Sequence, residues 1–256
     1  MKVVFLGTNG WYDTPAGNTI CILIDIEKAS IILDAGSGLY KADRYFSAGK
    51  PVHLFLSHLH LDHIIGLHLL NKFDIPQGLT IHCRKGDKES LNKIIAPPYS
   101  LPFSSLPYSV DIEEVDADLI ELDGFSVQAA LMMHSVPTIG FRLSLEGKTI
   151  TYCPDTGYCD NAVRLAESAD LLIAECAFRP GEESPHWPHL NPESAARLAR
   201  DAGARQLVLV HFDASRYPDM DARRIAQVKA REIFPDTSFA TDGQVLVIQP
   251  DSPANH

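Results

Sequence analysis

The most constraining stretch of this sequence is residues 57–63, which read SHLHLDH. It places three histidines and an aspartate within six residues, between the apolar run 52–56 and a second apolar segment, 64–70. The first run predicts a buried strand and the second a buried or amphipathic helix, so the cluster lies on a strand-to-helix turn. Imidazole and carboxylate ligands suit zinc, and also manganese or iron. A polar loop with scattered histidines is the alternative, but four potential ligands so close together predict a metal site.

The composition is that of an ordinary globular protein and limits the partners of the chain. Of its 256 residues, 45% are hydrophobic and 21% charged, which allows a sizeable core without disulfides. The formal net charge of -11 argues against a broad phosphate-binding surface, so general nucleic-acid binding is not expected. A small phosphorylated substrate remains compatible with this charge, because bound dications reverse it locally.

The cysteines and the apolar runs predict a cytoplasmic protein without a membrane anchor. The five cysteines form no CxxC pair, which is typical of reduced core thiols. The apolar run at residues 3–6 is too short for a signal peptide. No apolar run approaches the roughly 20 residues that span a bilayer, so no membrane association is expected.

Chemically active side chains follow apolar strands along the whole chain. Each of the following residues comes just after such a strand: Asp34, His58, His134, Asp155, Glu175 and His211. Strands that deliver polar groups at their ends build one shared site along a sheet edge. Scattered polar residues in loops would not show this order.

The strands fall into two comparable sets, before and after about residue 124. This predicts two packed sheets with helices outside, in a single α/β domain over residues 1–256. Its pseudo-halves are expected at about 1–124 and 125–249, followed by a flexible tail at 250–256. Helices are expected at residues 39–48, 64–70, 87–96, 161–168, 191–202 and 219–233, with Asn191 as the N-cap of the fifth.

Residues 97–108 interrupt this pattern with four prolines and three aromatic residues. Such a composition forbids regular structure. We interpret the segment as a substrate-facing flap or a subunit contact, since exposed aromatic side chains favour both. A surface connection with its aromatic side chains tucked inward is the alternative.

The order of these residues resembles the ligand set of the metallo-β-lactamase superfamily over nearly the whole chain. The specific part is His58-x-His60-x-Asp62-His63, and the single residues His134, Asp155 and His211 follow in the same order. The resemblance implies an αββα four-layer sandwich of two mixed β-sheets flanked by helices.

Shorter segments resemble the RNase Z-like and phosphodiesterase branch of that superfamily. They are residues 32–36 (ILDAG), 134–142 (HSVPTIGFR), 154–156 (PDT, where the branch has Gly-Asp-Thr), 174–178 (AECAF), and His189 with 211–217 (HFDASRY).

Three departures from the family pattern bear on function. RNase Z proper has a tRNA-gripping arm between the segments that match His134 and Asp155, where this chain has room only for a tight hairpin. The flavodiiron branch has Glu at the position of His60, so His60 favours zinc over iron. Some lactam hydrolases have cysteine at the position of Asp155, which disfavours a β-lactamase.

The resemblance implies a dinuclear centre. His58, His60 and His134 would hold one ion, and Asp155 would bridge to a second ion. The second ion would be held by Asp62, His63 and His211. Two Zn²⁺ ions are expected, with Mn²⁺ as the alternative.

The residues proposed for catalysis, besides Asp62, are His189 and Glu175. His189 is the expected proton donor to the leaving alkoxide, and Glu175 would hold its ring in the correct tautomer. Alternatively, His189 only enters a helix and Glu175 orients a metal ligand, and His186 is the rival donor. Asp34 is expected to hydrogen-bond a ligand imidazole.

Candidate substrate contacts are Arg216, Thr138 and Asn9. Arg142 is expected to be structural. Three further histidines lie on strand or helix faces and are not expected to bind metal: His53, His68 and His82.

The leading hypothesis is a dinuclear zinc phosphodiesterase that uses a metal-bridging hydroxide on a small or nucleotide-like phosphodiester. The enzyme alternatives are RNase Z-type processing of precursor tRNA and hydrolysis of a carbon ester, lactone or thioester. A metal-binding protein without turnover is the non-enzyme alternative. The family resemblance leaves a homodimer open.

Overall fold

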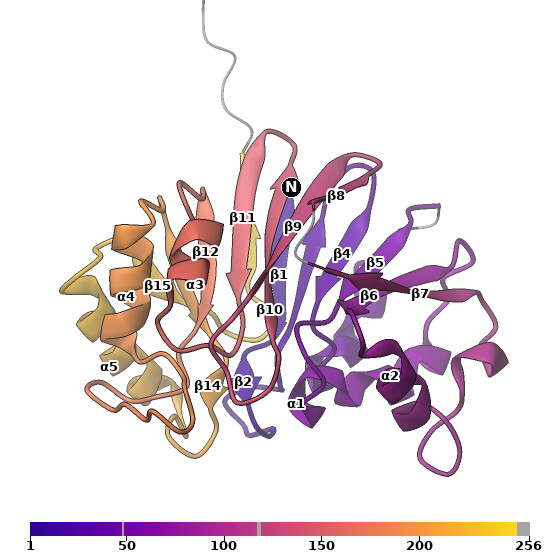
Figure 1. The fold of residues 1–256 in the computed structure, drawn as a ribbon, viewed down its shortest axis with the longest axis horizontal. Helices are drawn as coiled ribbons and strands as arrows, with labels where there is room; N and C mark the ends of the chain where they lie inside the picture. Colours follow the sequence, from indigo (N-terminus) through magenta and orange to yellow (C-terminus); the bar gives the residue numbers. More distant parts are fainter. Residues whose placement is uncertain (48, 117–118, 250–256) are drawn as a thin grey trace, which may run out of the picture.

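The computed structural model describes residues 1–47, 49–116 and 119–249. The expected tail at 250–256 and the last residue of the expected helix at 39–48 lie outside these ranges. Within them the chain forms two mixed β-sheets that pack face to face, with helices on both outer faces (Figure 1). The predicted four-layer α/β architecture is therefore confirmed.

The first sheet takes its strands mainly from the N-terminal half of the chain. Its order is β16-β1-β3-β4-β5-β6-β7. These strands are β1 (Lys2–Gly7), β3 (Cys21–Asp25), β4 (Ser30–Leu33), β5 (Val52–Phe55), β6 (Leu79–Arg84), β7 (Val110–Val115) and β16 (Val245–Val247). β3 and β4 form an antiparallel hairpin, whereas β4, β5, β6 and β7 run parallel to one another.

The second sheet has the order β15-β13-β12-β11-β10-β9-β8. Its strands are β8 (Leu119–Leu122), β9 (Phe125–Leu131), β10 (Ile139–Leu145), β11 (Lys148–Cys153), β12 (Leu171–Glu175), β13 (Leu207–Val210) and β15 (Thr237–Phe239). The predicted hairpin of β10 and β11 turns at Glu146 and Gly147, both with positive φ. From β11 to β15 the pairings are parallel.

Two strands cross the division expected near residue 124. β8 precedes that position but pairs with β9 in the second sheet. β16 comes last in the chain but pairs with β1 in the first sheet, so that Lys2 lies opposite Val247. The boundary between the sheets therefore does not coincide with one point in the sequence.

Apolar side chains fill three layers of core. One cluster lies between the sheets and includes Val3 and Phe5, while the next residues along β1, Val4 and Leu6, face the outer helices of the first sheet. This alternation is the period of two that a strand imposes on its side chains. The outer layer of the first sheet contains η1 (Ser37–Arg44), α1 (Leu61–Ile64), η2 (Ile65–Lys72), α2 (Lys88–Ile94) and η3 (Phe103–Ser105). The outer layer of the second contains α3 (Asp160–Leu165), α4 (Pro192–Asp201) and α5 (Met220–Arg231).

The segment after the histidine cluster differs from the expected helix. The short α-helix α1 begins within the cluster and continues as the 3₁₀ helix η2. The helix expected at residues 39–48 is likewise a 3₁₀ helix, η1. Gly66 brings η2 against the loop after β4, since a Cβ there would lie 2.3 Å from the carbonyl oxygen of Gly36. This close approach, which only glycine allows, fixes α1 beside Asp34 and its loop.

The strands β4, β5, β9, β11, β12 and β13 all end at one edge of the sandwich, at the bottom of Figure 1. A small parallel sheet lies at the same edge and ties the loop after β1 to the segment after β13. It consists of β2 (Asn9–Gly10) and β14 (Phe212–Asp213). The polar residues that follow these strands are therefore brought together. Within the ranges that the structure describes, no helix has the length and apolar character needed to cross a membrane.

Asn191 should stabilise the fold as the N-cap of α4. Its side chain accepts a hydrogen bond from the Ser194 backbone N–H at 2.8 Å, and the Asn191 N–H donates to the Ser194 hydroxyl oxygen at 2.9 Å. We expect Asn191→Ala to lower the free energy of unfolding by about 1 kcal/mol in urea denaturation, because it leaves helical N–H groups unpaired. Arg197→Ala, on the exposed face of the same helix, is the control. Equal stability of the two variants would contradict the capping role.

Candidate metal centre

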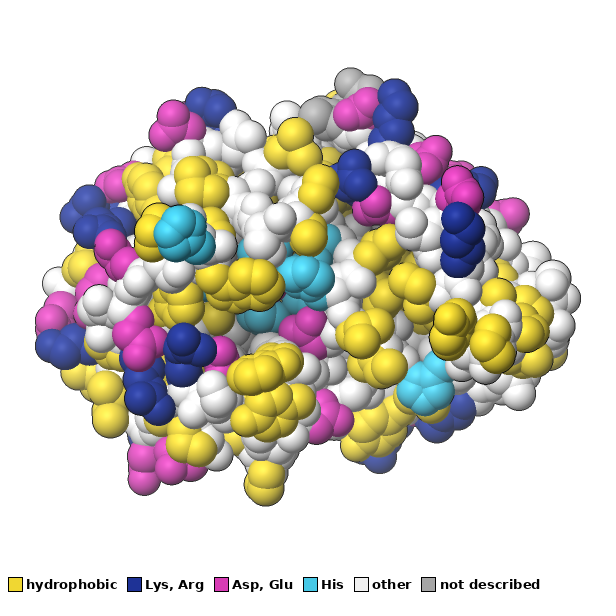
Figure 2. All heavy atoms as spheres, turned by 60° about the horizontal axis from the view of Figure 1, so that its bottom comes forward, with side chains coloured by type: hydrophobic (Ala, Val, Ile, Leu, Met, Phe, Trp, Pro, Cys, Tyr) yellow, Lys and Arg dark blue, Asp and Glu magenta, His cyan; other side chains and the backbone are white. Residues whose placement is uncertain are grey.

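Seven histidine and aspartate side chains meet at the edge where the strands end. They come from the loop after β5, from α1, and from the loops after β9, β11 and β13. Figure 2 shows histidine side chains at the centre of a hollow on this face, bordered by hydrophobic side chains. They form two groups, each of which could hold one metal ion: His58, His60, His134 with Asp155, and Asp62, His63 with His211. Asp155 and His211 also form a third such group with His189.

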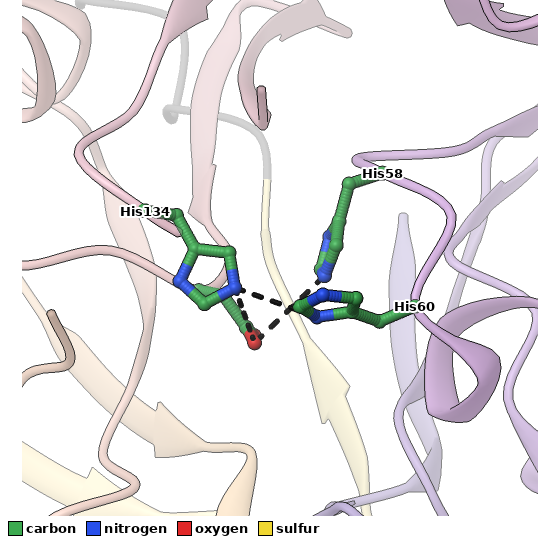
Figure 3. Close-up of side chains that lie close together, drawn as sticks. His58, His60 and His134 are labelled. Carbon is green, nitrogen blue, oxygen red and sulfur yellow. Dashed lines mark hydrogen bonds and ion pairs between the residues drawn. The ribbon is translucent and has the colours of Figure 1, made fainter. Parts of the chain in front are cut away.

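In the first group, three imidazoles from both sheets turn toward one point (Figure 3). His134 Nε2 lies 3.4 Å from His60 Nδ1 and 3.6 Å from Asp155 Oδ2. His58 Nε2 lies 3.9 Å from the same carboxylate oxygen. Three neutral imidazoles and one carboxylate oxygen form a ligand set suited to zinc.

The second group is built around His211. Its Nε2 lies 3.1 Å from His63 Nε2 and 3.2 Å from Asp62 Oδ2. Asp155 also faces this group, with Oδ1 at 3.2 Å from His63 Nε2 and 3.1 Å from His211 Nε2. Asp155 therefore turns one oxygen to each group, which is the arrangement of a bridging carboxylate.

The polar atoms at this centre fit a pair of cations. Among the described residues, His58 Nε2 and Asp155 Oδ1 are buried and form no hydrogen bond. Leaving such atoms unpaired costs on the order of 1–3 kcal/mol each, and one cation in each group would satisfy them. Burial, together with the imidazole of His63, holds the pKa of His58 well below its usual range. Burial acts to raise the pKa of Asp155, but His211 and His63 hold it well below its usual range. A neutral imidazole and an ionised carboxylate are the forms that bind metal.

Asp34, which follows β4, contacts His63 and two neighbouring side chains in the buried layer beneath the two groups. It accepts hydrogen bonds from the Ser57 N–H at 2.8 Å and from the Tyr152 hydroxyl at 2.7 Å, and its Oδ2 lies 2.8 Å from His63 Nδ1. Because Nδ1 of His63 is occupied, Nε2 is the nitrogen left for a metal. Sequence reasoning missed Ser57 and Tyr152.

The loop after β2 contacts the second group, which sequence reasoning also missed. The backbone N–H of Trp11 donates to Asp62 Oδ2 at 2.7 Å. The ring of His211 packs directly on Gly10, where a Cβ would lie only 2.4 Å from His211 Cε1. Gly10 therefore leaves the space that the His211 ring occupies.

His189 and Glu175 form a hydrogen-bonded pair beside both groups. His189 Nδ1 lies 2.6 Å from Glu175 Oε1, and Glu175 also accepts from the Thr156 and Ala177 N–H groups at 2.9 and 2.8 Å. Burial by itself lowers the pKa of His189, but the charge and hydrogen bond of Glu175 raise it to about 9. The ring of His189 lies 5.1 Å from that of His134, centre to centre.

A cavity of about 600 Å³ opens over these side chains, and its walls include Trp11, Trp187, His189 and Arg216. His186, the rival proton donor, is exposed and does not line this cavity. Arg216 lines it but is paired with Asp213 at 2.5 Å and Glu182 at 2.9 Å.

Two of the expected substrate contacts point elsewhere, and the geometry corrects them. Asn9 is buried; its amide donates to Tyr12, Thr14 and Gly17, and its oxygen accepts from Arg223. Thr138 is buried and donates to the Val136 carbonyl at 3.1 Å. Asn9 opens the two-residue strand β2 and Thr138 directly precedes β10, and sequence alone cannot tell a loop-bracing side chain from a cavity-lining one at such positions.

His53, His68 and His82, which are not expected to bind metal, lie apart from the two groups. His53 and His82 contact each other through ring nitrogens 3.1 Å apart, and His68 lies beside the Ile65 carbonyl. Arg142 donates to the Leu165 and Glu167 carbonyls, which agrees with its expected structural role.

The proline-rich segment 97–108 agrees with the simpler interpretation of a surface connection. Phe103 is buried in the outer core, and the Tyr108 hydroxyl donates to the Leu70 carbonyl at 2.6 Å. Only Tyr99 of its three aromatic residues is largely exposed, at 80%. No residue of this segment lines the metal cavity, so the geometry does not support a flap over it.

Comparison with protein families gives a match over most of the chain. The model described as "Beta-lactamase superfamily domain" matches residues 30–212, which include all seven side chains of the two groups. This agrees with the resemblance seen in the ordered histidine and aspartate motifs.

Two curated relatives are ribonucleases. The chain is 27% identical to a ribonuclease Z from Thermosynechococcus vestitus over 326 aligned positions, which cover 99% of this chain and 79% of that protein. It is also 27% identical to ribonuclease BN from Escherichia coli O1:K1, covering 97% of this chain and all of the relative. Because 326 positions exceed the 256 residues of this chain, the first relative contains segments that this chain lacks.

Solved structures show the same fold. The metallo-β-lactamase fold protein YhfI from Bacillus subtilis superposes with a TM-score of 0.80 at 26% identity, over 96% of this chain and 98% of that one. A diphosphatase of the PhnP family gives 0.73 at 15% identity, over 97% and 98%. Zinc-bound PqqB from Methylobacterium extorquens gives 0.72 at 18%, over 97% and 100%.

The contact between Gly10 and His211 makes Gly10→Ala a test of the second group. The added methyl group has to displace the His211 ring, so we expect zinc affinity and turnover each to fall by about 10- to 100-fold. Competition with a chromogenic chelator measures the affinity, and thermal unfolding verifies that the variant is folded. Unchanged zinc affinity in the folded variant would show that His211 is not a ligand.

Proposed function

The chain belongs to the β-lactamase superfamily and is a metallo-hydrolase, and on that premise we propose that it is a dinuclear zinc phosphodiesterase. Its proposed substrate is a small or nucleotide-like phosphodiester. The observation that carries the proposal is Asp155, whose two oxygens face two separate groups of ligand atoms. This arrangement suits an in-line displacement at phosphorus that needs two adjacent cations.

The charge of the proposed metal centre suits an anionic substrate. When bound, two divalent ions would lower the pKa of a water molecule and offset the charge on the phosphate oxygens. The ligand set has five imidazoles and two carboxylates, so it leaves a strong net positive charge at the centre. A singly charged phosphodiester fits that charge. Asp62, which accepts a hydrogen bond from the backbone N–H of Trp11, is one of the two carboxylates that limit the net positive charge of the centre.

His189 is proposed as the general acid. Its Nδ1 is engaged by Glu175, so that a proton on Nε2 is available to a leaving alkoxide in the cavity. Glu175 is itself fixed by two backbone N–H groups, and it acts by orienting the His189 ring. His186 is the less favoured donor because it does not line the cavity.

Zinc is the proposed metal because imidazole nitrogens dominate the ligand set. The likeness to zinc-bound PqqB agrees with this choice at the level of the fold. Manganese remains the alternative.

RNase Z-type cleavage of precursor tRNA is the second candidate function, favoured by the ribonuclease relatives. Three observations weigh against it. The net charge is -11, the β10–β11 connection is a tight turn, and the ribonuclease Z relative has segments absent here. Because the same cation pair also activates water for attack on a carbonyl, a carbon ester, lactone or thioester is a further candidate.

A substrate panel with added zinc or manganese tests these alternatives directly. It contains bis(p-nitrophenyl) phosphate, cyclic nucleotides, a lactone, a thioester and a precursor tRNA. We expect turnover of the small phosphodiesters. Turnover of the lactone or the thioester alone would overturn the proposal, and efficient cleavage of the tRNA alone would favour the second candidate.

Asp155→Ala should release both metals, because its side chain serves both groups. We expect bound zinc to fall from two ions to fewer than one per chain and phosphodiester turnover to be lost. Elemental analysis after gel filtration measures the stoichiometry. Asp123→Ala, at an exposed carboxylate, is the control and should keep both ions. Retention of two zinc ions by Asp155→Ala would refute the bridging role.

His189→Ala should slow the enzyme most for poor leaving groups, because only these need a proton in the transition state. We expect kcat to fall by about 10²- to 10⁴-fold for an alkyl ester and much less for p-nitrophenolate release. Glu175→Gln should show the same dependence, and His186→Ala should behave as wild type. If His189→Ala slows both substrates equally, His189 is not the acid.

A further inference from the structure

Both tryptophans of the chain stand in the wall of the metal cavity. Trp11 follows β2 and is 66% exposed, whereas Trp187 lies in the loop before α4 and is 49% exposed. Figure 2 shows hydrophobic side chains on either side of the histidines in the hollow. Exposed tryptophans beside a polar centre are characteristic of ligand contacts, because a folded chain otherwise buries so large an apolar surface.

Each tryptophan is held beside one of the two ligand groups. The Trp187 ring lies nearly parallel to that of His60, at 11° and 6.0 Å between centres, and edge-on to that of His134 at 5.7 Å. Trp11 is anchored at the other group by its N–H bond to Asp62. Its φ of 72° is unusual for a bulky residue and requires support from the surrounding loop. The backbone of Trp11 and the ring of Trp187 are thus each fixed beside one of the two groups.

The cavity offers little free positive charge to a substrate. Arg216 is the one arginine or lysine among the described residues that line it, and two carboxylates neutralise it. A polyphosphate or a long nucleic-acid backbone would find few partners beyond the cations. The walls therefore fit a substrate with one anionic centre and a neutral, flat remainder.

We propose that Trp11 and Trp187 bind a planar aromatic group of the substrate by stacking. The substrate would then be a phosphodiester that carries an aromatic ring, such as the base of a nucleotide. This inference rests on the proposed phosphodiesterase function and adds the chemical class of the ester group. A π-face recognises any planar ring and prefers it to an aliphatic group of the same size.

Intrinsic fluorescence can test binding without turnover, because the chain has only these two tryptophans. The zinc-loaded protein is titrated with methyl phenylphosphonate and with methyl cyclohexylphosphonate, two singly charged analogues of similar size. We expect the phenyl compound to quench the emission and to bind about tenfold more tightly. Trp11→Phe and Trp187→Phe, each with one tryptophan left, assign the quenching to a side chain. Equal affinity for the two compounds would overturn the inference.

Kinetics with a constant leaving group provide the second test. Phenyl p-nitrophenyl phosphate and cyclohexyl p-nitrophenyl phosphate differ only in the ester group that is retained. We expect kcat/KM to be about tenfold higher for the phenyl ester, and this ratio to approach one in Trp11→Leu or Trp187→Leu. Tyr99→Ala removes an exposed aromatic side chain outside the cavity and should keep the wild-type ratio.

The outcomes separate this inference from the proposed function. Equal turnover of both esters by the wild-type enzyme, or preference for the cyclohexyl ester, would refute stacking and leave the phosphodiesterase intact. Turnover of neither ester would refute the phosphodiesterase, and the fluorescence titration would still decide whether the tryptophans bind aromatic groups.

Discussion

The arrangement of the candidate site depends on one buried carboxylate, that of Asp155. Its two oxygens lie within 3.2 Å of His63 and His211 on one side and 3.6 Å of His134 on the other. Five imidazoles crowded around a carboxylate need a surrounding structure that holds their rings in position. Asp34, Gly10 and the Trp11 N–H supply it by fixing His63, His211 and Asp62 respectively.

Neither ligand group can form within one sheet. The residues from the β5–α1 segment belong to the first sheet, whereas His134, Asp155 and His211 follow strands of the second. Each group is therefore completed only when the sheets pack face to face. Metal binding should in turn stabilise that packing, because ions bind the assembled set more tightly than either half. This coupling explains why so polar a cluster can lie at the edge of an apolar core.

Much of this was predictable from sequence, and the failures have physical causes. The cluster at residues 57–63 is local, so its spacing alone predicts a metal site, and strand ends predict where His134, Asp155 and His211 meet it. The edge strands β7, β8 and β15 were missed because they are short or mostly polar. Trp11 and Gly10 were missed because their importance lies in contacts with residues 51 and 201 positions away in the chain. The burial of Asn9 was missed for the same reason, since its partner Arg223 lies 214 positions away in the chain.

The chemistry of the centre and the choice of substrate are separable in this fold. The ligand residues come from strand ends and α1, which the packing of the sheets fixes. The cavity walls come from the loops that contain Trp11 and Trp187, and loops can change without disturbing the sheets. The additional segments of the ribonuclease Z relative, and the aromatic walls and neutralised Arg216 of this chain, support our proposal that this chain acts on a phosphodiester with a small uncharged group. On this argument, exchanging the two loops should change specificity, whereas changes at the strand ends should abolish catalysis.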